Sequence, residues 1–160
     1  MIDYFVREKT SECDRKIKDF FYDTFYVPEG TSTLPREILT IPYYQKYYDG
    51  LGSRKGDYCY EAYDTHRKCI IGIVWTRLIS GELNIDSRVP FLMVSVSAEY
   101  RGMGVGSALM VRILSELQHA GYNKVILSVH RHNRALALYE RHGFFIYDSD
   151  EENYMMMKLL

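Results

Sequence analysis

One stretch of the chain, residues 91–118, has the residue types and the spacing of a site that binds an anion. An apolar, β-rich run at 91–96 is followed by a short polar turn and then by the segment Arg101-Gly102-Met103-Gly104-Val105-Gly106. An amphipathic helix follows at once. Glycines let backbone N–H groups approach a phosphate closely, and the N-terminus of a helix favours negative charge. Arg101 adds a fixed cation at the entrance of the loop, so we expect a phosphate group here.

Three kinds of phosphate loop can be compared with this segment. The dinucleotide fingerprint G-x-G-x-x-G fails, because Ser107 or Leu109 stands where its last glycine should be. The triphosphate loop G-x-x-x-x-G-K-[ST] fails as well, because no lysine follows Gly106. The pattern [QR]-x-x-G-x-[GA] is met by Arg101, Gly104 and Gly106. On this motif alone, a glycine-rich turn that only caps an ordinary helix stays an open alternative.

A second motif lies downstream, at 133–144, after another β-rich run. Its sequence is NRALALYERHGF, which resembles N-x-x-A-x-x-x-Y-x-x-x-G-F with Asn133, Tyr139, Gly143 and Phe144 in place and alanine at 135 or 137. In this order and at this separation, the two motifs resemble the two signatures of the GNAT superfamily of N-acetyltransferases. The resemblance covers about residues 91–147, and the first half of the chain matches only by its pattern of elements.

The resemblance implies a fold, a cosubstrate and a set of binding residues. The fold is α/β, a central mixed and mostly antiparallel sheet of about seven strands flanked by about four helices. The cosubstrate is acetyl-CoA, with its pyrophosphate on the glycine loop and its pantetheine arm along the central strand, as if another strand had been added. The implied cofactor-binding residues are Val94, Ser95, Val96, Arg101, Gly102, Met103, Gly104, Val105, Gly106, Ser107, Asn133 and Tyr139.

The resemblance also implies direct attack of an amine on the thioester in a ternary complex. Tyr139 matches the general acid of the family, which protonates the departing thiolate. A phenol has an ordinary pKa of about 10, so it holds its proton at neutral pH and can donate it. The alternative is that Tyr139 only packs against the pantetheine arm. Asn133 is expected to cap its helix and to contact the same arm.

The general base is not assigned by the sequence. Many members of the family carry glutamate on the central strand or the next one, whereas 91–96 contains no carboxylate and Ser128 stands where a common glutamate would be. His130, Glu61 and a tyrosine-lined water chain stay open as alternatives. The missing glutamate supports a competing function, a non-catalytic acyl-CoA-binding sensor or regulatory module.

Composition limits the remaining functions. The chain has 160 residues and a net charge of −1 from 20 basic and 21 acidic residues, so we expect one domain over 1–160 that does not bind nucleic acid non-specifically. No apolar run approaches the roughly 20 residues of a membrane span, and no signal peptide is visible, so we expect a cytoplasmic protein. Three cysteines without metal-type spacing indicate reduced thiols and no metal site. The expected partner is an amine acceptor, either a small molecule or a peptide, and a homodimer is conceivable.

The elements that position these residues follow from apolar periodicity and turn residues. We expect strands at 2–7, 57–64, 69–79, 91–96, 124–130, 144–148 and 154–160. A first helix is expected from its cap Ser11 to before Pro28, a second helical segment at 34–48 with an interruption near Pro42, a third helix from the glycine loop to Gly121 and a fourth at 133–142. Four tyrosines in the second helix, Tyr43, Tyr44, Tyr47 and Tyr48, are expected to share a face, which either packs on the core or forms an aromatic wall for the acceptor. The loop at 50–56 is expected to be mobile, as a lid or a linker.

Overall fold

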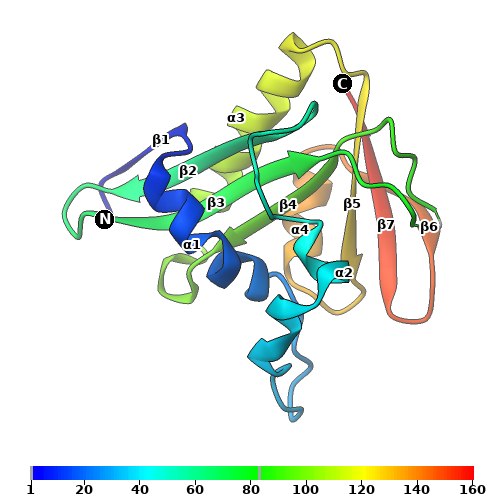
Figure 1. Cartoon of the computed structure of the whole chain (residues 1–160), viewed down its shortest axis with the longest axis horizontal. Helices are drawn as coiled ribbons and strands as arrows, with labels where there is room; N and C mark the ends of the chain where they lie inside the picture. The colour runs from blue at the N-terminus through cyan, green and yellow to red at the C-terminus, as the bar shows by residue number, and fades with distance from the viewer. Residues whose placement is uncertain (1, 83) are drawn as a thin grey trace.

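The computed structural model describes residues 2–82 and 84–160 and contains a seven-stranded mixed sheet in the order β1-β2-β3-β4-β5-β7-β6 (Figure 1). All neighbouring strands are antiparallel except β4 and β5. The strands are β1 (Tyr4–Glu8), β2 (Tyr58–Asp64), β3 (Cys69–Arg77), β4 (Phe91–Val96), β5 (Lys124–His130), β6 (Phe145–Ser149) and β7 (Asn153–Leu159). The predicted fold class and element order are therefore confirmed.

Helices cover both faces of the sheet. In Figure 1, α1 (Ser11–Tyr22) and α2 (Pro42–Gln45) lie in front of the sheet, and α3 (Val105–His119) and α4 (Ala135–Arg141) lie behind it. Strand side chains alternate between the two faces, so each face has its own apolar cluster. Ile73 and Trp75 pack with α1, whereas Val74 and Leu92 pack with α3.

The α3 stripe expected from the sequence is the centre of the rear core. Val105, Leu109, Ile113 and Leu117 are each at most 1% exposed. Burying an aliphatic side chain of this size stabilises the fold by about 1.5–3 kcal/mol. This packing fixes the direction of α3, and therefore also the position of the glycine loop at its N-terminus.

The parallel pair β4–β5 separates almost as soon as it forms. The register contains one pair only, Phe91 with Ile126, and the N–H of Ile126 donates to the carbonyl of Pro90 at 3.0 Å. On its other side, β4 pairs with β3 along its whole length. Beyond Phe91, the edge of β4 that faces β5 has no ladder, and the sheet is split at this point.

The helical segment expected at 34–48 is interrupted at Pro42 as predicted, but both of its parts are shorter than expected. The structure has a 3-10 turn, η1 (Arg36–Thr40), and then the single-turn helix α2. The physical reason is proline, because Pro35 and Pro42 lack a backbone N–H and disfavour helical geometry in the residue before them. Ile41 is accordingly extended, with φ −83° and ψ 124°.

The cap expected for α1 also differs. Ser11 is the first residue of the helix, and Thr10 occupies the N-cap position without a side-chain capping bond. The hydroxyl and the N–H of Thr10 both bond the carboxylate of Glu61 at 3.1 Å. A buried carboxylate on β2 therefore holds the start of this helix.

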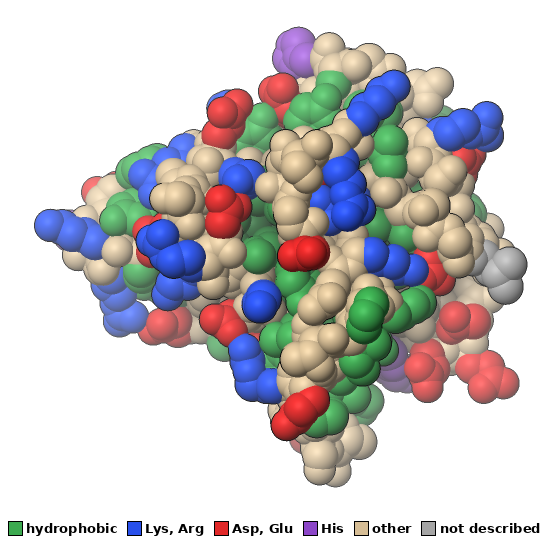
Figure 2. All heavy atoms as spheres, in the orientation of Figure 1, with side chains coloured by type: hydrophobic (Ala, Val, Ile, Leu, Met, Phe, Trp, Pro, Cys, Tyr) green, Lys and Arg blue, Asp and Glu red, His purple; other side chains and the backbone are tan. Residues whose placement is uncertain are grey.

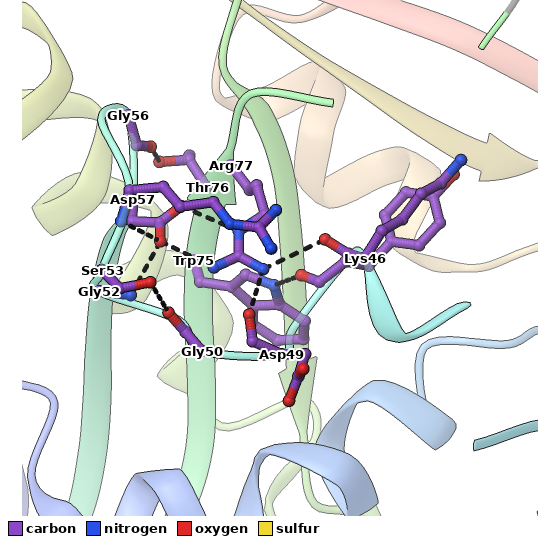
Figure 3. Close-up of polar contacts among 12 residues, drawn as sticks. Lys46, Asp49, Gly50, Gly52, Ser53, Gly56, Asp57, Trp75, Thr76 and Arg77 are labelled. Atoms are coloured by element: carbon purple, nitrogen blue, oxygen red, sulfur yellow. Dashed lines mark hydrogen bonds and ion pairs between the residues drawn. The ribbon is translucent and has the colours of Figure 1, made fainter. Parts of the chain in front are cut away.

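The loop at 50–56 is tied to β3, contrary to the expectation of a mobile segment. Arg77 and Asp57 are fully buried and form a two-bond ion pair with N–O distances of 2.9 and 2.8 Å (Figure 3). The Asp57 carboxylate accepts the N–H groups of Gly52 and Arg54, and the Arg77 guanidinium donates to the carbonyls of Lys46 and Asp49. This Arg77 clamp, completed by the bond from Trp75 Nε1 to the carbonyl of Tyr47, fixes the chain that follows α2.

Among the residues that the structure describes, no helix has both the length and the apolar character that crossing a membrane requires.

Candidate functional site

The glycine loop lies directly in front of α3. Gly102 and Gly104 have φ values of +75° and +86°, in the left-handed region that favours glycine. A Cβ added at either would meet nothing within 4 Å, so the space beside the loop is open. Gly104 is the N-cap of α3, and the N–H groups of Val105, Gly106 and Ser107 begin the helix without intrahelical partners. These donors and the helix dipole make an anion site.

Two side chains near the loop already have partners within the protein. Arg101 is exposed, and its Nε donates to the carbonyl of Val96 at 3.0 Å. Ser107 Oγ lies 2.8 Å from Nε2 of His142, which joins the start of α3 to the end of α4. The anion site therefore rests mainly on backbone N–H groups, with the outer nitrogens of Arg101 beside them.

The open edge of β4 offers backbone groups to a ligand. The N–H of Ser97 donates to the carbonyl of Ile71, so by strand alternation the backbone of Ser95 also faces β3. The N–H and C=O groups of Val94 and Val96 then face the split. The edge that the sequence assigned to 94–96 thus presents the backbone of its two valines.

Ser95 contributes a hydroxyl in place of backbone groups. It lies opposite Ile73 in the register, on the face covered by α1, and it is 6% exposed. Among the described residues, its Oγ is the only buried side-chain N or O atom without a hydrogen-bond partner. A buried unpaired hydroxyl destabilises a protein by about 1–3 kcal/mol, so a polar ligand at the split would fit this atom.

Tyr139 lies on α4, on the rear face of the sheet. It is 8% exposed and packs against Phe144, with the ring centroids 6.0 Å apart. Burial raises the pKa of Tyr139 well above its ordinary value, so the phenol stays protonated throughout the neutral range. Asn133 lies one residue before the N-cap of α4, which is Arg134 and not Asn133 as expected, and its Oδ1 accepts the N–H of Ala135 at 2.9 Å.

Two of the candidate bases are engaged elsewhere. Glu61 is buried on β2, where Arg7 bonds its carboxylate at 2.6 Å alongside Thr10. The Nδ1 of His130 accepts the N–H of His132 at 3.1 Å, and its ring stacks on that of Tyr26. Ser128 is exposed on β5 and lines a cavity. No base is assigned.

This cavity, the front cavity, has a volume of about 260 Å³ and opens on the face covered by α1 and α2. Its floor is formed by side chains of the central strands, Phe91, Ser128 and Met155. Phe91 and Ile126 pair at the point where the sheet splits, and Ser128 is the next residue of β5 on the same face as Ile126. The cavity therefore adjoins the split from the front, whereas the glycine loop and Tyr139 belong to elements on the rear face.

The four tyrosines of 43–48 divide between the two roles considered for them. Tyr43 and Tyr47 line the front cavity. Tyr48 is 2% exposed and donates its hydroxyl to the carbonyl of Leu39, and Tyr44 packs edge-on against Phe25. They do not share one face, because residues four apart lie on the same side of a helical turn, so 43 and 47 lie on one side and 44 and 48 on another.

Sequence reasoning missed the acidic residues of the front cavity. Glu82 lines it from the β3–β4 loop, and Asp148 and Asp150 line it from the β6–β7 hairpin. Burial alone would raise the pKa of Glu82, but hydrogen bonds from Lys46 and Tyr43 outweigh it and hold the pKa below the usual value. The acidic run at 148–152 is the only trace of these residues visible in the sequence. Its position beside the split depends on the order of the strands in the sheet, which the sequence alone does not give.

Comparisons with known proteins agree with this geometry. A family model described as "Acetyltransferase (GNAT) family" matches residues 15–144. A mycothiol acetyltransferase of Arthrobacter sp. (strain FB24) is 35% identical over 82 residues, which are 51% of this chain and 25% of that protein. The chain thus spans about a quarter of the length of the curated relatives that it matches.

Solved structures match over almost the whole chain. An acetyltransferase of the GNAT family from Streptococcus pneumoniae has a TM-score of 0.70 at 22% identity, with 99% of both chains covered. A PaiA N-acetyltransferase from Thermoplasma acidophilum, in complex with coenzyme A, has a TM-score of 0.69 at 15% identity, with 99% of this chain and 100% of that chain covered. At these identities, the likeness establishes a shared fold.

Proposed function

The chain belongs to the GNAT acetyltransferase family, and we propose that it transfers the acetyl group of acetyl-CoA to a primary amine of a small molecule or a peptide. The observation that carries the proposal is the split between β4 and β5, which are paired only at Phe91 and Ile126. The glycine loop and Tyr139 approach it from one face of the sheet, and the front cavity adjoins it from the other. Two substrates arriving from opposite faces would meet there, as direct transfer in a ternary complex requires.

The residues present fit acetyl-CoA. The N–H groups at the start of α3 suit its pyrophosphate. The backbone groups of Val94 and the N–H of Val96 at the open edge of β4 suit the amides of its pantetheine arm, whereas the carbonyl of Val96 already accepts Nε of Arg101. Gly102 and Gly104 leave room for the phosphates. The proposed binding residues also include Asn133, just before α4, and Tyr139, within α4. No metal is required by this chemistry.

Bound acetyl-CoA supplies a thioester carbon for the amine to attack. On the protein side, a backbone N–H at the open edge of β4 donates to the developing oxyanion. The hydroxyl of Ser95 gains a polar partner at the split. Tyr139 keeps its proton at neutral pH and donates it from its phenolic oxygen to the departing sulfur.

The activity is tested by incubating the protein with acetyl-CoA and a panel of diamines, monoamines, amino acids and peptides, while thiol release reports free CoA. Release that depends on one class of amine, with a product heavier by one acetyl group, is the expected result. CoA binding without release across the panel would contradict the proposal and favour an acyl-CoA sensor.

The binding site is tested with Gly104→Asp, which places a carboxylate in the anion site and strains a φ of +86°. We expect CoA affinity measured by calorimetry to be lost. Gly121→Asp is the matched control, because Gly121 has φ +93° and equally open surroundings but follows the opposite end of α3. Equal CoA affinity in the Gly104→Asp protein and the control would refute the site.

A further inference from the structure

We propose that the acceptor is a small aliphatic dication, in which one amine is acetylated while a second ammonium group lies against Asp148 and Asp150. The inference rests on the proposed function and names the substrate class of the same site. It starts from the front cavity, whose volume of about 260 Å³ is slightly below the roughly 300–1,000 Å³ of pockets for drug-sized ligands. A small molecule fits such a space better than a folded segment of a protein.

The front cavity is negatively charged. Three carboxylates line it, those of Glu82, Asp148 and Asp150, and its lining among the described residues contains no lysine, arginine or histidine. Figure 2 shows acidic side chains gathered at the lower right of this face, where Figure 1 places the end of the β6–β7 hairpin. An anionic substrate is disfavoured in such a cavity, and a cationic one is favoured.

The three carboxylates are not equivalent. Glu82 is already paired with the ammonium of Lys46. Within the part of the chain that the structure describes, neither Asp148 nor Asp150 has an ion-pair partner. Their carboxylates accept backbone N–H groups of their own hairpin. Arg131 donates to the backbone carbonyl of Asp150, and its charge also acts on the Asp150 carboxylate without forming an ion pair. These two aspartates are therefore the ones left to bind a cation.

Lys46 shows that one wall of the front cavity stabilises an alkylammonium group. Its Nζ lies 4.1 Å from the ring centroid of Tyr43 and 5.3 Å from that of Tyr47, while it contacts the Glu82 carboxylate. An ammonium over aromatic faces and beside a carboxylate is stabilised by both. Tyr43, Tyr47 and Glu82 all line the cavity, but the ammonium of Lys46 already occupies this wall, so the second ammonium of a substrate is left to the aspartates of the hairpin.

The arrangement also separates the two ends of the substrate. Phe91 and Ser128 mark the split, where the reacting amine has to be, and the aspartates lie on the hairpin at another part of the lining. Apolar side chains of Ile85, Phe91 and Met155 line the cavity as well and suit a methylene chain. A molecule with a cation at each end and a hydrocarbon middle matches this order of polar and apolar surface.

The test compares 1,5-diaminopentane with 1-aminohexane, which has the same number of heavy atoms but a methyl group in place of the second ammonium. With acetyl-CoA saturating and ionic strength low, we expect kcat/KM for the diamine to be about 10-fold higher, the size of two partly exposed ion pairs. The double variant D148N/D150N should lose this preference, because kcat/KM for the diamine falls to about that for 1-aminohexane. Asparagine keeps the acceptor oxygens that hold the hairpin.

The matched control is E151Q/E152Q, which removes the same charge from the same hairpin at side chains that do not line the cavity. It should retain the diamine preference. Equal kcat/KM for the two amines in the unmodified protein, or an equal loss of preference in both double variants, would overturn the inference while the acetyltransferase activity stands. Failure of every amine to release CoA would instead overturn the proposed function. Calorimetry of both amines on the CoA-bound protein repeats the comparison without turnover, and equal affinities there would also overturn the inference.

Discussion

At the scale of single residues, the proposed chemistry depends on groups that the fold keeps polar or protonated inside an apolar environment. Tyr139 is surrounded by the rear core, and burial raises its pKa. Ser95 keeps a hydroxyl without a partner at the split. The unpaired hydroxyl of Ser95 is unfavourable for stability alone, which is the pattern expected where binding takes precedence over stability.

The first prediction concerns Tyr139→Phe, which keeps the ring and removes only the proton donor. We expect CoA affinity to stay nearly unchanged while kcat falls by about 10²–10⁴-fold, the usual size for loss of general acid–base help. The Michaelis constant need not rise, because the lost interaction belongs to the transition state. The rates are measured where chemistry, not product release, limits turnover.

Tyr122→Phe is the matched control, because this tyrosine packs on Tyr58 away from α4. It should leave both quantities unchanged. If Tyr139→Phe turned over at the rate of the unmodified protein, Tyr139 would only pack against the pantetheine arm, and the CoA site would be unaffected.

At the scale of elements, the Arg77 clamp holds the cavity wall in place. Tyr43 and Tyr47 belong to a short segment whose own helix has four residues, too few for independent stability. The guanidinium of Arg77 bonds the carbonyls of Lys46 and Asp49, and Trp75 bonds that of Tyr47. The position of the tyrosines over the split is therefore set by β3.

The second prediction concerns Asp57→Ala, which leaves the fully buried Arg77 without its partner. Breaking a buried ion pair in this way costs about 3–5 kcal/mol, so we expect the free energy of unfolding to fall by that amount in urea titrations. Glu99→Gln, which removes the partner of Arg67 in a mostly exposed pair, should leave the urea midpoint almost unchanged. A stable Asp57→Ala protein would show that the clamp does not hold the segment.

At the scale of the whole molecule, the charges of the fold should make it sensitive to acid. Hydrogen bonds from Arg88 hold the pKa of Asp86 at about 2. Burial opposes the lowering at Asp57, but hydrogen bonds from Arg77 and two backbone amides outweigh it, and amides of Asn153 and Glu152 lower the pKa of Asp150. Asp23 has the opposite effect on the pH dependence of stability, because burial raises its pKa.

The third prediction follows from the sign of these shifts. A carboxyl group whose pKa is lower in the folded state binds fewer protons there than in the unfolded chain, so stability rises with pH in that window. We expect the urea midpoint to fall as the pH drops below about 4, the ordinary pKa of these groups. A midpoint that rises on acidification would contradict the assignment. In the Asp57→Asn protein, the urea midpoint should fall less steeply below about pH 4.

The sequence by itself predicted most of the strands and helices and the position of the glycine loop, where the proposed cosubstrate would bind. The strands at 91–96 and 124–130 have the predicted bounds, and the apolar stripe of α3 is buried as expected. The glycine loop could be located because Gly102 and Gly104 are required by their own backbone angles, a constraint that acts within a few residues. Local signals of this kind do not depend on the rest of the fold.

Only the tertiary structure decided which residues line the front cavity, the proposed acceptor site. Tyr43, Glu82, Ser128 and Asp148 are far apart in the sequence and lie on four different elements or loops. They meet because β7 pairs between β5 and β6, and because the buried Arg77 holds 46–57 against β3. Contacts at such separations arise from packing of the whole sheet, which no periodicity or motif encodes, so the charge of the front cavity became visible only in the folded chain.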